Sequence, residues 1–325
     1  RSENGIIGVF NMQPATNSFK LKEQSRKILL KRVLSYREIY IMLIPAMLFY
    51  LIFCYGPMYG ITLAFKDYWS SKGILGSPWV GFDNFRVIFK SQAFWKVFRN
   101  TLEINIGRLI FGFPMPIILA LMLNELKSEH YKRTIQTIIY LPHFLSWVII
   151  AGIIFALFSN DGLVNNIIVY LGFEKINFLA NPKTFRPMVI ISDIWKEMGW
   201  GTIIYLAAIS GISPEMYEAA IVDGAGRWSK MFYITIPSIL PTVSVLLIMR
   251  MGGLISGGFD QIFNLYNPAV YEVGDIIDTY VFRIGLSEGN FQIGTAIGLL
   301  LNVINAMMLF IANYFSKKIS GNGLY

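Results

Sequence analysis

The chain has 325 residues, a formal net charge of +8 and a single cysteine. Hydrophobic residues make up 54% of it and charged residues only 15%, whereas soluble globular domains carry about 25% charged residues. With a mean hydropathy of +0.52, this composition indicates a protein whose main solvent is lipid. It excludes a water-soluble nucleic-acid-binding domain, which would need a basic face on a polar fold. A lone cysteine, Cys54, also excludes an internal disulfide.

The N-terminal segment, residues 1–37, is polar and basic. It lacks the apolar core and small-residue cleavage site of a signal peptide, so we expect no cleavage there. Residues 19–36 have the pattern of a basic amphipathic helix lying on the membrane surface. The alternative is a disordered tail, which we expect for residues 1–18.

Six apolar stretches follow that are long enough to cross a bilayer, which takes about 20 mostly apolar residues. They cover residues 39–65, 101–123, 134–158, 187–209, 236–258 and 291–315. Prolines inside them predict kinks, because proline removes a helical hydrogen bond. These are Pro45, Pro57, Pro114, Pro116, Pro142 and Pro241. In lipid, the freed carbonyls need neighbouring helices or a polar cavity, so the prolines indicate a packed bundle around a pathway.

The orientation follows from the distribution of Lys and Arg, which concentrate in cytoplasmic loops. They are denser on the side that holds both termini and the loop between the fourth and fifth stretches. We therefore expect an all-α integral membrane protein with six kinked spans and both termini in the cytoplasm. No internal repeat is visible, which weighs against the common secondary-transporter folds.

The loop between the fourth and fifth stretches carries the signals of a short helix. Ser213 is a suitable N-cap and Pro214 a suitable first helical residue. The helix is expected to end near Val222, with Gly224 in a left-handed conformation after it. The residues alone leave open whether this is a docking helix or an ordinary interfacial helix.

The spacing of residues in this loop resembles the EAA loop of ABC importer permeases of the maltose type. The matching residues are Glu218, Ala219, Ala220, Gly224, Ile234, Ile236 and Pro237. Ile236 departs from the family, which usually has Leu there. The resemblance covers residues 99–316. Residues 56–60 and 64–68 also resemble the branch that transports complex and acidic oligosaccharides such as alginate.

The resemblance implies a type I ABC importer permease fold with four parts. These are a cytoplasmic segment (1–37), a first span with its outer loop (38–98), a five-helix core (99–316) and a cytoplasmic tail (317–325). Within the core, residues 211–237 would form the loop that couples the chain to an ATPase. The coupling residues implied are Glu218, Ala219, Ala220, Asp223, Gly224 and Pro237.

The resemblance also implies partners. These are a second and different permease, two ATPase subunits that hold ATP and magnesium, and an extracytoplasmic solute-binding protein. The chain itself would hold no cofactor or metal. It would lie in the inner (plasma) membrane of a bacterium and move an oligosaccharide into the cytoplasm by alternating access.

Polar and aromatic side chains in the fourth and fifth stretches are the candidates for the substrate pathway, because polar groups inside a membrane are costly. They are Trp195, Glu197, Trp200, Arg250, Gln261 and Asn264. Alignment outward from the EAA loop to the maltose-type permease, whose ligand contacts lie in the spans on either side of this loop, implies Glu197, Trp200, Ile255 and Gly258 as pathway residues. For each, a structural role is the alternative; Lys196 and Glu197, for example, could snorkel to the outer boundary.

Two arginines in the apolar stretches are considered separately. Arg250 and Arg108 would suit a uronate chain. Arg108 could instead pair with Glu103 or bind a carbonyl in a kink.

Two other classes of protein compete with this interpretation. A proton-coupled secondary sugar carrier would need paired carboxylates deep in the bundle, where Glu103 and Asp193 are isolated candidates. An intramembrane enzyme would need a catalytic constellation, but the only histidines are His130 and His143, and no HExxH motif is present.

Overall fold

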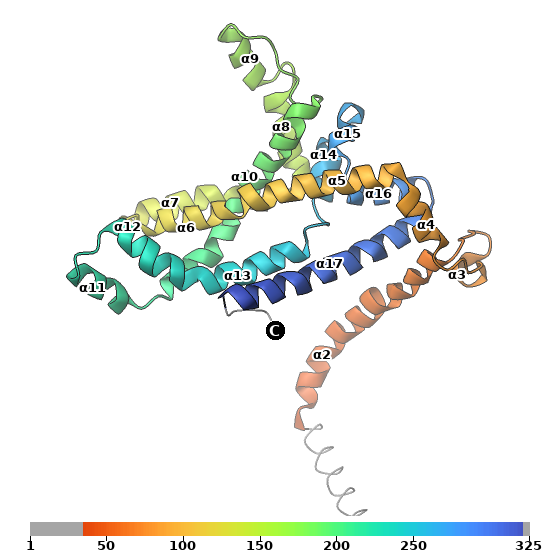
Figure 1. The fold of residues 1–325 in the computed structure, drawn as a ribbon, viewed down its shortest axis with the longest axis horizontal. Helices are drawn as coiled ribbons and strands as arrows, with labels where there is room; N and C mark the ends of the chain where they lie inside the picture. Colours follow the sequence, from red (N-terminus) through yellow and green to blue (C-terminus); the bar gives the residue numbers. More distant parts are fainter. Residues whose placement is uncertain (1–34, 321–325) are drawn as a thin grey trace, which may run out of the picture. The chain divides into compact units, whose positions relative to one another are not determined.

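The computed structural model describes residues 35–320, so the predictions for residues 1–18 and for an amphipathic helix beginning at residue 19 lie outside it. Within these residues every regular element is a helix, and the only strand-like pairing is an isolated bridge between Lys66 and Trp79 (Figure 1). The chain divides into two units, residues 1–60 and 61–325.

The first unit holds most of the first span. It contains α2 (Arg37–Phe49), the π-helical η1 (Tyr50–Tyr55) and the start of the 3₁₀-helical η2 (Gly56–Phe65). α2 continues through Pro45, one of the prolines predicted to kink a span. No side chain of α2 or η1 is buried in the chain itself.

The second span is longer than predicted. It consists of α5 (Gln92–Gly107), the π-helical turn η3 (Arg108–Gly112) and α6 (Pro114–Asn124). The π turn lies directly before Pro114 and Pro116. In a regular α-helix the proline rings would clash with carbonyl oxygens of the preceding turn, and the wider π turn moves these oxygens away. The prolines therefore produce a widened turn with Arg108 as its first residue.

The prediction of one continuous third span over residues 134–158 is wrong. The segment forms α7 (Glu129–Tyr140), the 3₁₀ turn η4 (Leu141–Phe144) and α8 (Trp147–Phe158), followed by α9 (Leu163–Tyr170). Pro142 lies in η4, and the side chain of Ser146 caps a new helix by accepting a hydrogen bond from the Ile149 amide (3.4 Å). The break therefore separates two helices with different directions, α7 and α8 (Figure 1).

The predicted fourth span corresponds to α10 (Pro182–Ser210), which packs along α6 and against η4. Gly199 makes the second contact possible, because a Cβ there would overlap the carbonyl oxygen of Ile139 at the end of α7. Near the start of α10, Phe185 and Val189 pack with Ile150 of α8 and Ile262 of α14 (Phe259–Leu265). This core cluster holds α8 and α14 against α10.

The fifth span starts earlier and ends earlier than predicted. A continuous helix runs through α12 (Arg227–Lys230), the π-helical η5 (Met231–Thr235) and α13 (Ile236–Gly252). It continues through Pro241, one of the prolines predicted to kink a span. It stops at Gly252 rather than at Gly258, since Gly257 and Gly258 have positive φ angles of 99° and 101°, which are incompatible with a right-handed helix.

The sixth span, α17 (Phe291–Ser320), packs against α13. The remaining helices are short: α3 (Gly73–Gly76), α4 (Asp83–Lys90), η6 (Pro268–Val270), α15 (Tyr271–Gly274), α16 (Ile277–Phe282) and η7 (Arg283–Ser287). A salt bridge connects η7 to the residue after α15: the guanidinium of Arg283 lies 2.5 Å from the carboxylate of Asp275. Its hydrogen bond to Asp275 raises the pKa of Arg283.

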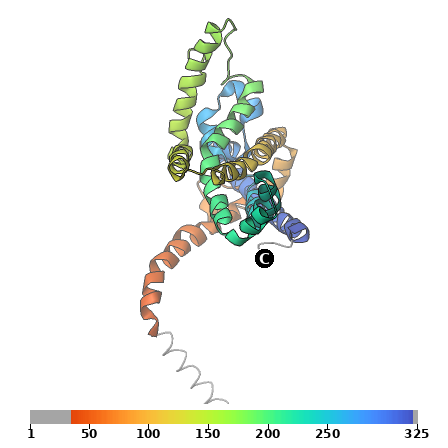
Figure 2. The same ribbon diagram turned by 90° about the vertical axis from the view of Figure 1, so that its left-hand side faces the viewer.

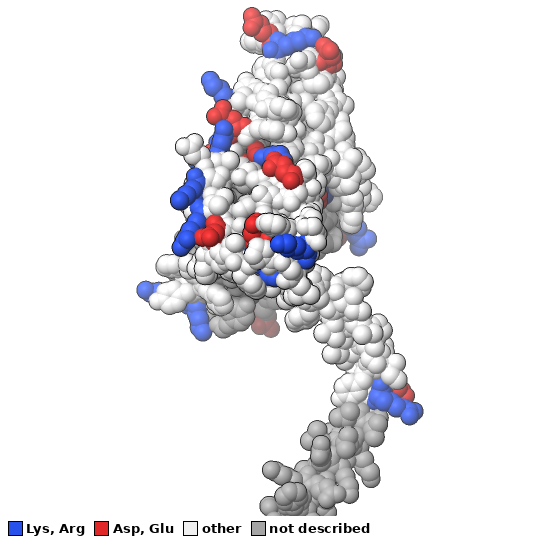
Figure 3. Space-filling model, turned by 90° about the vertical axis from the view of Figure 1, so that its right-hand side faces the viewer, with Lys and Arg blue, Asp and Glu red and all other residues white. Residues whose placement is uncertain are grey.

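Five helical segments of the described chain are long and apolar enough to cross a membrane: Arg37–Phe65, Gln92–Asn124, Trp147–Tyr170, Arg227–Gly252 and Phe291–Lys318. By this measure α10 is not among them. Asp193, Lys196 and Glu197 fall in every 18-residue stretch of this 29-residue helix. In Figure 3, uncharged side chains cover most of the upper right of the view, whereas basic and acidic side chains both lie along its left side and near its centre.

Candidate functional site

The charged centre of the second unit is an acidic side chain between two basic ones. Asp193 of α10 lies 3.7 Å from Arg108 Nε and 3.7 Å from an Nη atom of Arg250, the latter near the end of α13. Arg108 and Asp193 have little exposed side chain (5% and 14%), whereas Arg250 is 50% exposed. Three helices distant in sequence thus bring their charges to one place.

Arg108 is held by a polar network rather than by a carboxylate alone. Its guanidinium donates to Asn105 Oδ1 (2.9 Å), to Gln261 Oε1 and, at 3.5 Å, to the carbonyl oxygen of Gly257. The amide of Gln261 in turn donates to the Val189 carbonyl (2.7 Å) on α10. The network ties η3, α10 and α14 together around a buried charge.

Gly258 is required for this arrangement. A Cβ at this position would lie 2.6 Å from Arg108 Nη1, and its φ of +101° disfavours any side chain. The guanidinium therefore occupies the space that a side chain at position 258 would fill.

The predicted pairing of Arg108 with Glu103 is wrong. Five residues along a helix turn the direction of a side chain by about 140°, so the two point to different sides of α5. Glu103 pairs instead with Arg99 (2.6 Å) and with Arg186 of α10. The alternative that Arg108 binds a carbonyl is confirmed by its contact with Gly257.

Two cavities meet at Asp193 and Arg250. One, of about 320 Å³, is lined by Arg108 and by Gly257, Gly258 and Gln261 of the segment after α13. The other, of about 410 Å³, is lined by Glu197, Trp200 and Tyr205 of α10 and by Pro116 of α6. The half-exposed guanidinium of Arg250 borders both cavities.

An aromatic and ionic group borders the second cavity. The ring of His143 in η4 stacks on the ring of Trp200, with centroids 4.6 Å apart and planes 4° apart. His143 Nδ1 lies 2.9 Å from a carboxylate oxygen of Glu197. Lys196 is 6% exposed and donates to the His143 carbonyl (2.6 Å), so the expectation that it snorkels outward is wrong.

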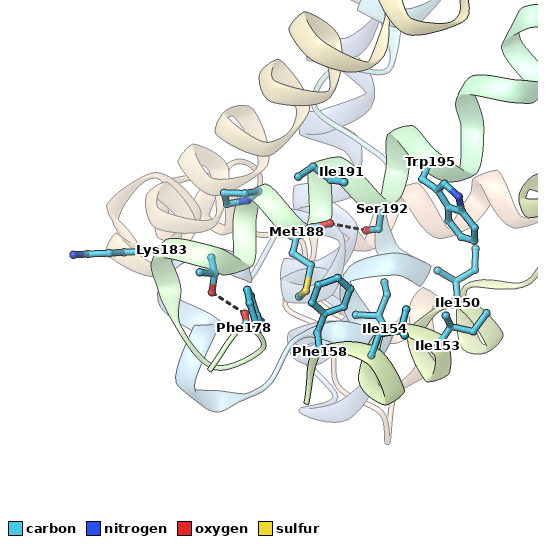
Figure 4. Close-up of a pocket in the computed structure, with 13 residues that line it drawn as sticks. Ile150, Ile153, Ile154, Phe158, Phe178, Lys183, Met188, Ile191, Ser192 and Trp195 are labelled. Atoms are coloured by element: carbon cyan, nitrogen blue, oxygen red, sulfur yellow. Dashed lines mark hydrogen bonds between the residues drawn. The ribbon is translucent and has the colours of Figure 1, made fainter. Parts of the chain in front are cut away.

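The structure brings together five of the eight predicted pathway residues: Glu197, Trp200, Arg250, Gly258 and Gln261. Trp195 faces a different, apolar cavity of about 420 Å³ between α8 and α10 (Figure 4). Ile255 is buried in a core cluster. Asn264 donates to the Asp260 carbonyl (2.6 Å) on its own helix.

Sequence reasoning did not name Asn105, and it considered Arg108, Asp193 and His143 without placing them among the eight predicted pathway residues. For Arg108 and Asp193 the signal was present, because a charged residue in the middle of an apolar stretch is a site candidate by default. For Asn105 and His143 only the tertiary contacts reveal the role.

The polar loop after α10 forms the short helix that the sequence predicted, α11 (Pro214–Val222). It ends in a Schellman motif: Gly224 N–H bonds to Ile221 O (3.0 Å) and Ala225 N–H to Ala220 O (2.8 Å). Gly224 has the expected positive φ, 77°. Ser213 occupies the N-cap, but its side chain makes no capping bond.

One end of the second unit is formed by α11 (Figure 1), and this helix stands in front when the unit is viewed from that end (Figure 2). It exposes Met216, Ile221 and Val222, the last at 87%. Glu218 is exposed and makes no ion pair with any described residue. The loop is nevertheless anchored, since Tyr217 OH lies 2.9 Å from Thr235 Oγ1 of η5. A stiff helix with an exposed apolar surface is thus tied to the start of the fifth span.

Long apolar helices around a polar, charged interior define a membrane-spanning transport protein. The chain belongs to the family of binding-protein-dependent transport system inner membrane components, whose model matches residues 112–321.

Two relatives from Bacillus subtilis (strain 168) are similar along nearly their whole length. Protein LplB is 46% identical over 288 residues, which is 88% of this chain and 91% of LplB. The polygalacturonan/rhamnogalacturonan transport system permease protein YteP is 43% identical over 313 residues, 96% of this chain and 98% of YteP.

The fold matches a chain in a crystal structure of a bacterial ABC transporter involved in the import of the acidic polysaccharide alginate. The TM-score is 0.84 and the identity 44%, over 90% of this chain and 99% of that chain. This protein therefore has the type I ABC permease fold and is a permease of a sugar ABC importer, not an enzyme. The resemblance found in the EAA loop is confirmed.

Proposed function

We propose that this permease moves a uronate-containing oligosaccharide into the bacterial cytoplasm. The half-exposed guanidinium of Arg250 carries the proposal. It borders both cavities, and its contact with Asp193 is long, 3.7 Å. A guanidinium is suited to a carboxylate, because its donors match the two carboxylate oxygens. The names of YteP and of the alginate transporter, which both refer to acidic polysaccharides, support the same substrate class.

The excess of positive charge around the cavities is small. Arg108, Lys196 and Arg250 face the carboxylates of Asp193 and Glu197. Arg108 is engaged by its polar network and Lys196 by the His143 carbonyl. The guanidinium of Arg250 makes no hydrogen bond to a described residue, so it is available to a ligand.

The mechanism follows from the connection of α11 to the spans. We propose that an ATPase subunit binds α11, with Glu218, Ala219, Ala220, Asp223, Gly224 and Pro237 forming the coupling loop. A rigid helix tied to η5 transmits a push to α13, whereas a flexible loop would absorb it. Closure of the ATPase subunits on ATP and magnesium then shifts the population between inward-facing and outward-facing packings.

We further propose six spans, with α10 as the fourth and both termini in the cytoplasm. The charges of α10 fit such a span because they face the cavities and α7–α8 rather than lipid. The complex would lie in the inner membrane. It would contain a second, different permease, two ATPase subunits and an extracytoplasmic binding protein; one neighbour structure includes a periplasmic protein bound to an alginate pentasaccharide.

The test is uptake by the copurified complex in proteoliposomes, supplied with its binding protein. A galacturonate tetrasaccharide and an alginate tetrasaccharide are compared with their carboxyl-reduced, neutral forms. Arg250→Gln is expected to lower uptake of the acidic sugars about tenfold, the loss of one charge-assisted hydrogen bond, and to leave the neutral sugars within about twofold. An equal loss on acidic and neutral sugars would count against recognition of the carboxylate.

A further inference from the structure

The break between α7 and α8 places one side chain against the wall of the substrate cavity. Pro142 ends the α7 helical pattern, and the absence of a side chain at Gly199 lets α10 touch the backbone at the end of α7. His143, the next residue after Pro142, consequently lies over Trp200, one residue after Gly199. Both ends of the contact are fixed by backbone packing.

His143 is held in place from two further directions. Its backbone carbonyl accepts a 2.6 Å bond from buried Lys196, and its ring nitrogen Nδ1 lies 2.9 Å from Glu197. Lys196 and Glu197 are themselves 3.6 Å apart. The imidazole plane is therefore set by the charges of α10, the helix that carries Trp200.

The stack determines how the indole is presented. His143 covers one face of Trp200, and the edge of Phe144 approaches the same ring, with centroids 5.9 Å apart. Trp200 is still 44% exposed and lines the cavity that Arg250 also borders. One face of the indole is thus buried by a flat ring of matching orientation, and exposed indole remains for a ligand.

We infer that His143 is a positioning residue that fixes Trp200 as a flat platform for one pyranose ring of the transported sugar. The C–H face of the pyranose would stack on the indole, while a carboxylate of the chain reaches Arg250. This inference rests on the proposed function and adds to it a second recognition element, which is specific for the sugar ring and not for its charge.

The test is a double-mutant cycle in the same proteoliposome assay, with the galacturonate tetrasaccharide as the probe. Trp200→Ala and His143→Ala are each expected to raise KM, by roughly 3- to 10-fold for loss of an aromatic contact, with the maximal rate within about twofold. If His143 acts through Trp200, the double variant is no worse than Trp200→Ala alone. His143→Phe, which keeps a flat ring, is expected to restore most of the lost affinity.

Trp195→Ala is the matched control. Trp195 lies on the same helix as Trp200 and has nearly the same exposure (41%), but it faces the apolar cavity of Figure 4. The KM of the Trp195→Ala complex is expected to stay within about twofold of the wild-type value. The carboxyl-reduced tetrasaccharide should show the same KM increases for His143→Ala and Trp200→Ala, since stacking needs no charge.

Additive effects in the cycle, a fall in maximal rate without a change in KM, or an equal effect of Trp195→Ala would each overturn the inference. These outcomes leave the proposed function standing. Failure of the wild-type complex to transport either acidic tetrasaccharide would instead refute the proposed substrate class.

Discussion

The clearest consequence of the structure concerns two neighbouring glycines that have nearly equal positive φ angles but different surroundings at the position of a Cβ. Gly257 and Gly258 have φ angles of +99° and +101°. A Cβ at Gly257 would meet nothing within 4 Å, whereas a Cβ at Gly258 would lie 2.6 Å from Arg108 Nη1. Alanine at either site therefore suffers the same backbone strain, and only alanine at 258 displaces the buried guanidinium.

The magnitudes can be worked out from these contacts. The positive φ alone costs roughly 1–2 kcal/mol for a residue with a Cβ, and both variants bear this cost. Moving Arg108 disturbs its bonds to Asn105 and Gln261, and hydrogen bonds to a charged group contribute about 1.5–3 kcal/mol each. Gly258→Ala should therefore be less stable than Gly257→Ala by about 1.5–3 kcal/mol.

The assay is thermal unfolding of the two variants purified side by side in the same detergent, followed by uptake of the galacturonate tetrasaccharide. Gly258→Ala is expected to unfold at a clearly lower temperature than Gly257→Ala and to lose about tenfold more uptake. Equal unfolding temperatures and equal uptake would refute the claim that the guanidinium of Arg108 packs against residue 258.

Three further predictions follow from single contacts. Gly199→Ala should destabilise the protein by several kcal/mol because its Cβ overlaps the Ile139 carbonyl, whereas Gly152→Ala, a helical site with open space, should raise the unfolding temperature slightly. Gly224→Asp should lower the unfolding temperature only slightly, because aspartate tolerates the left-handed region better than most residues, yet it should abolish uptake, since the φ of +77° at this position shapes the end of α11; normal uptake would contradict a coupling role. Burial raises the pKa of Asp278. The folded state is therefore stabilised at low pH, where this carboxyl is protonated, and it loses that stability as the pH rises from about 4 through the raised pKa. Asp278→Asn should flatten this pH dependence of the unfolding temperature.

The sequence was sufficient where local chemistry decides the structure. Pro214 and Gly224 predicted α11, its end near Val222 and the left-handed residue after it. These signals act over a few residues, so no tertiary information was needed. The EAA spacing then identified the family, which the relatives confirm.

The sequence was insufficient where a distant segment decides. Residues 134–158 are apolar enough for one span, but Pro142 and the contact of Ile139 with Gly199, 60 residues away, divide them. Arg108 had an acidic residue nearby in sequence, Glu103, yet its distant partners are Asp193, Gly257 and Gln261. Hydropathy reports the environment of a segment and does not report which helix packs against it.

The same limit applies to the predicted pathway residues, because a distant segment decides which cavity each of them faces. Trp195 and Trp200 are both tryptophans of α10, and composition does not distinguish them. They differ by about 140° around the helix, and only the packing of α8 and η4 shows which cavity each one faces.

The most direct test of the account is the ATPase activity of the wild-type complex, reconstituted with its binding protein. We predict that the galacturonate or the alginate tetrasaccharide stimulates ATP hydrolysis, and that the carboxyl-reduced form of the same sugar stimulates it at least about tenfold less at equal concentration. Equal stimulation by the acidic and the neutral sugar, or by neither, would contradict the proposal that this permease imports uronate oligosaccharides.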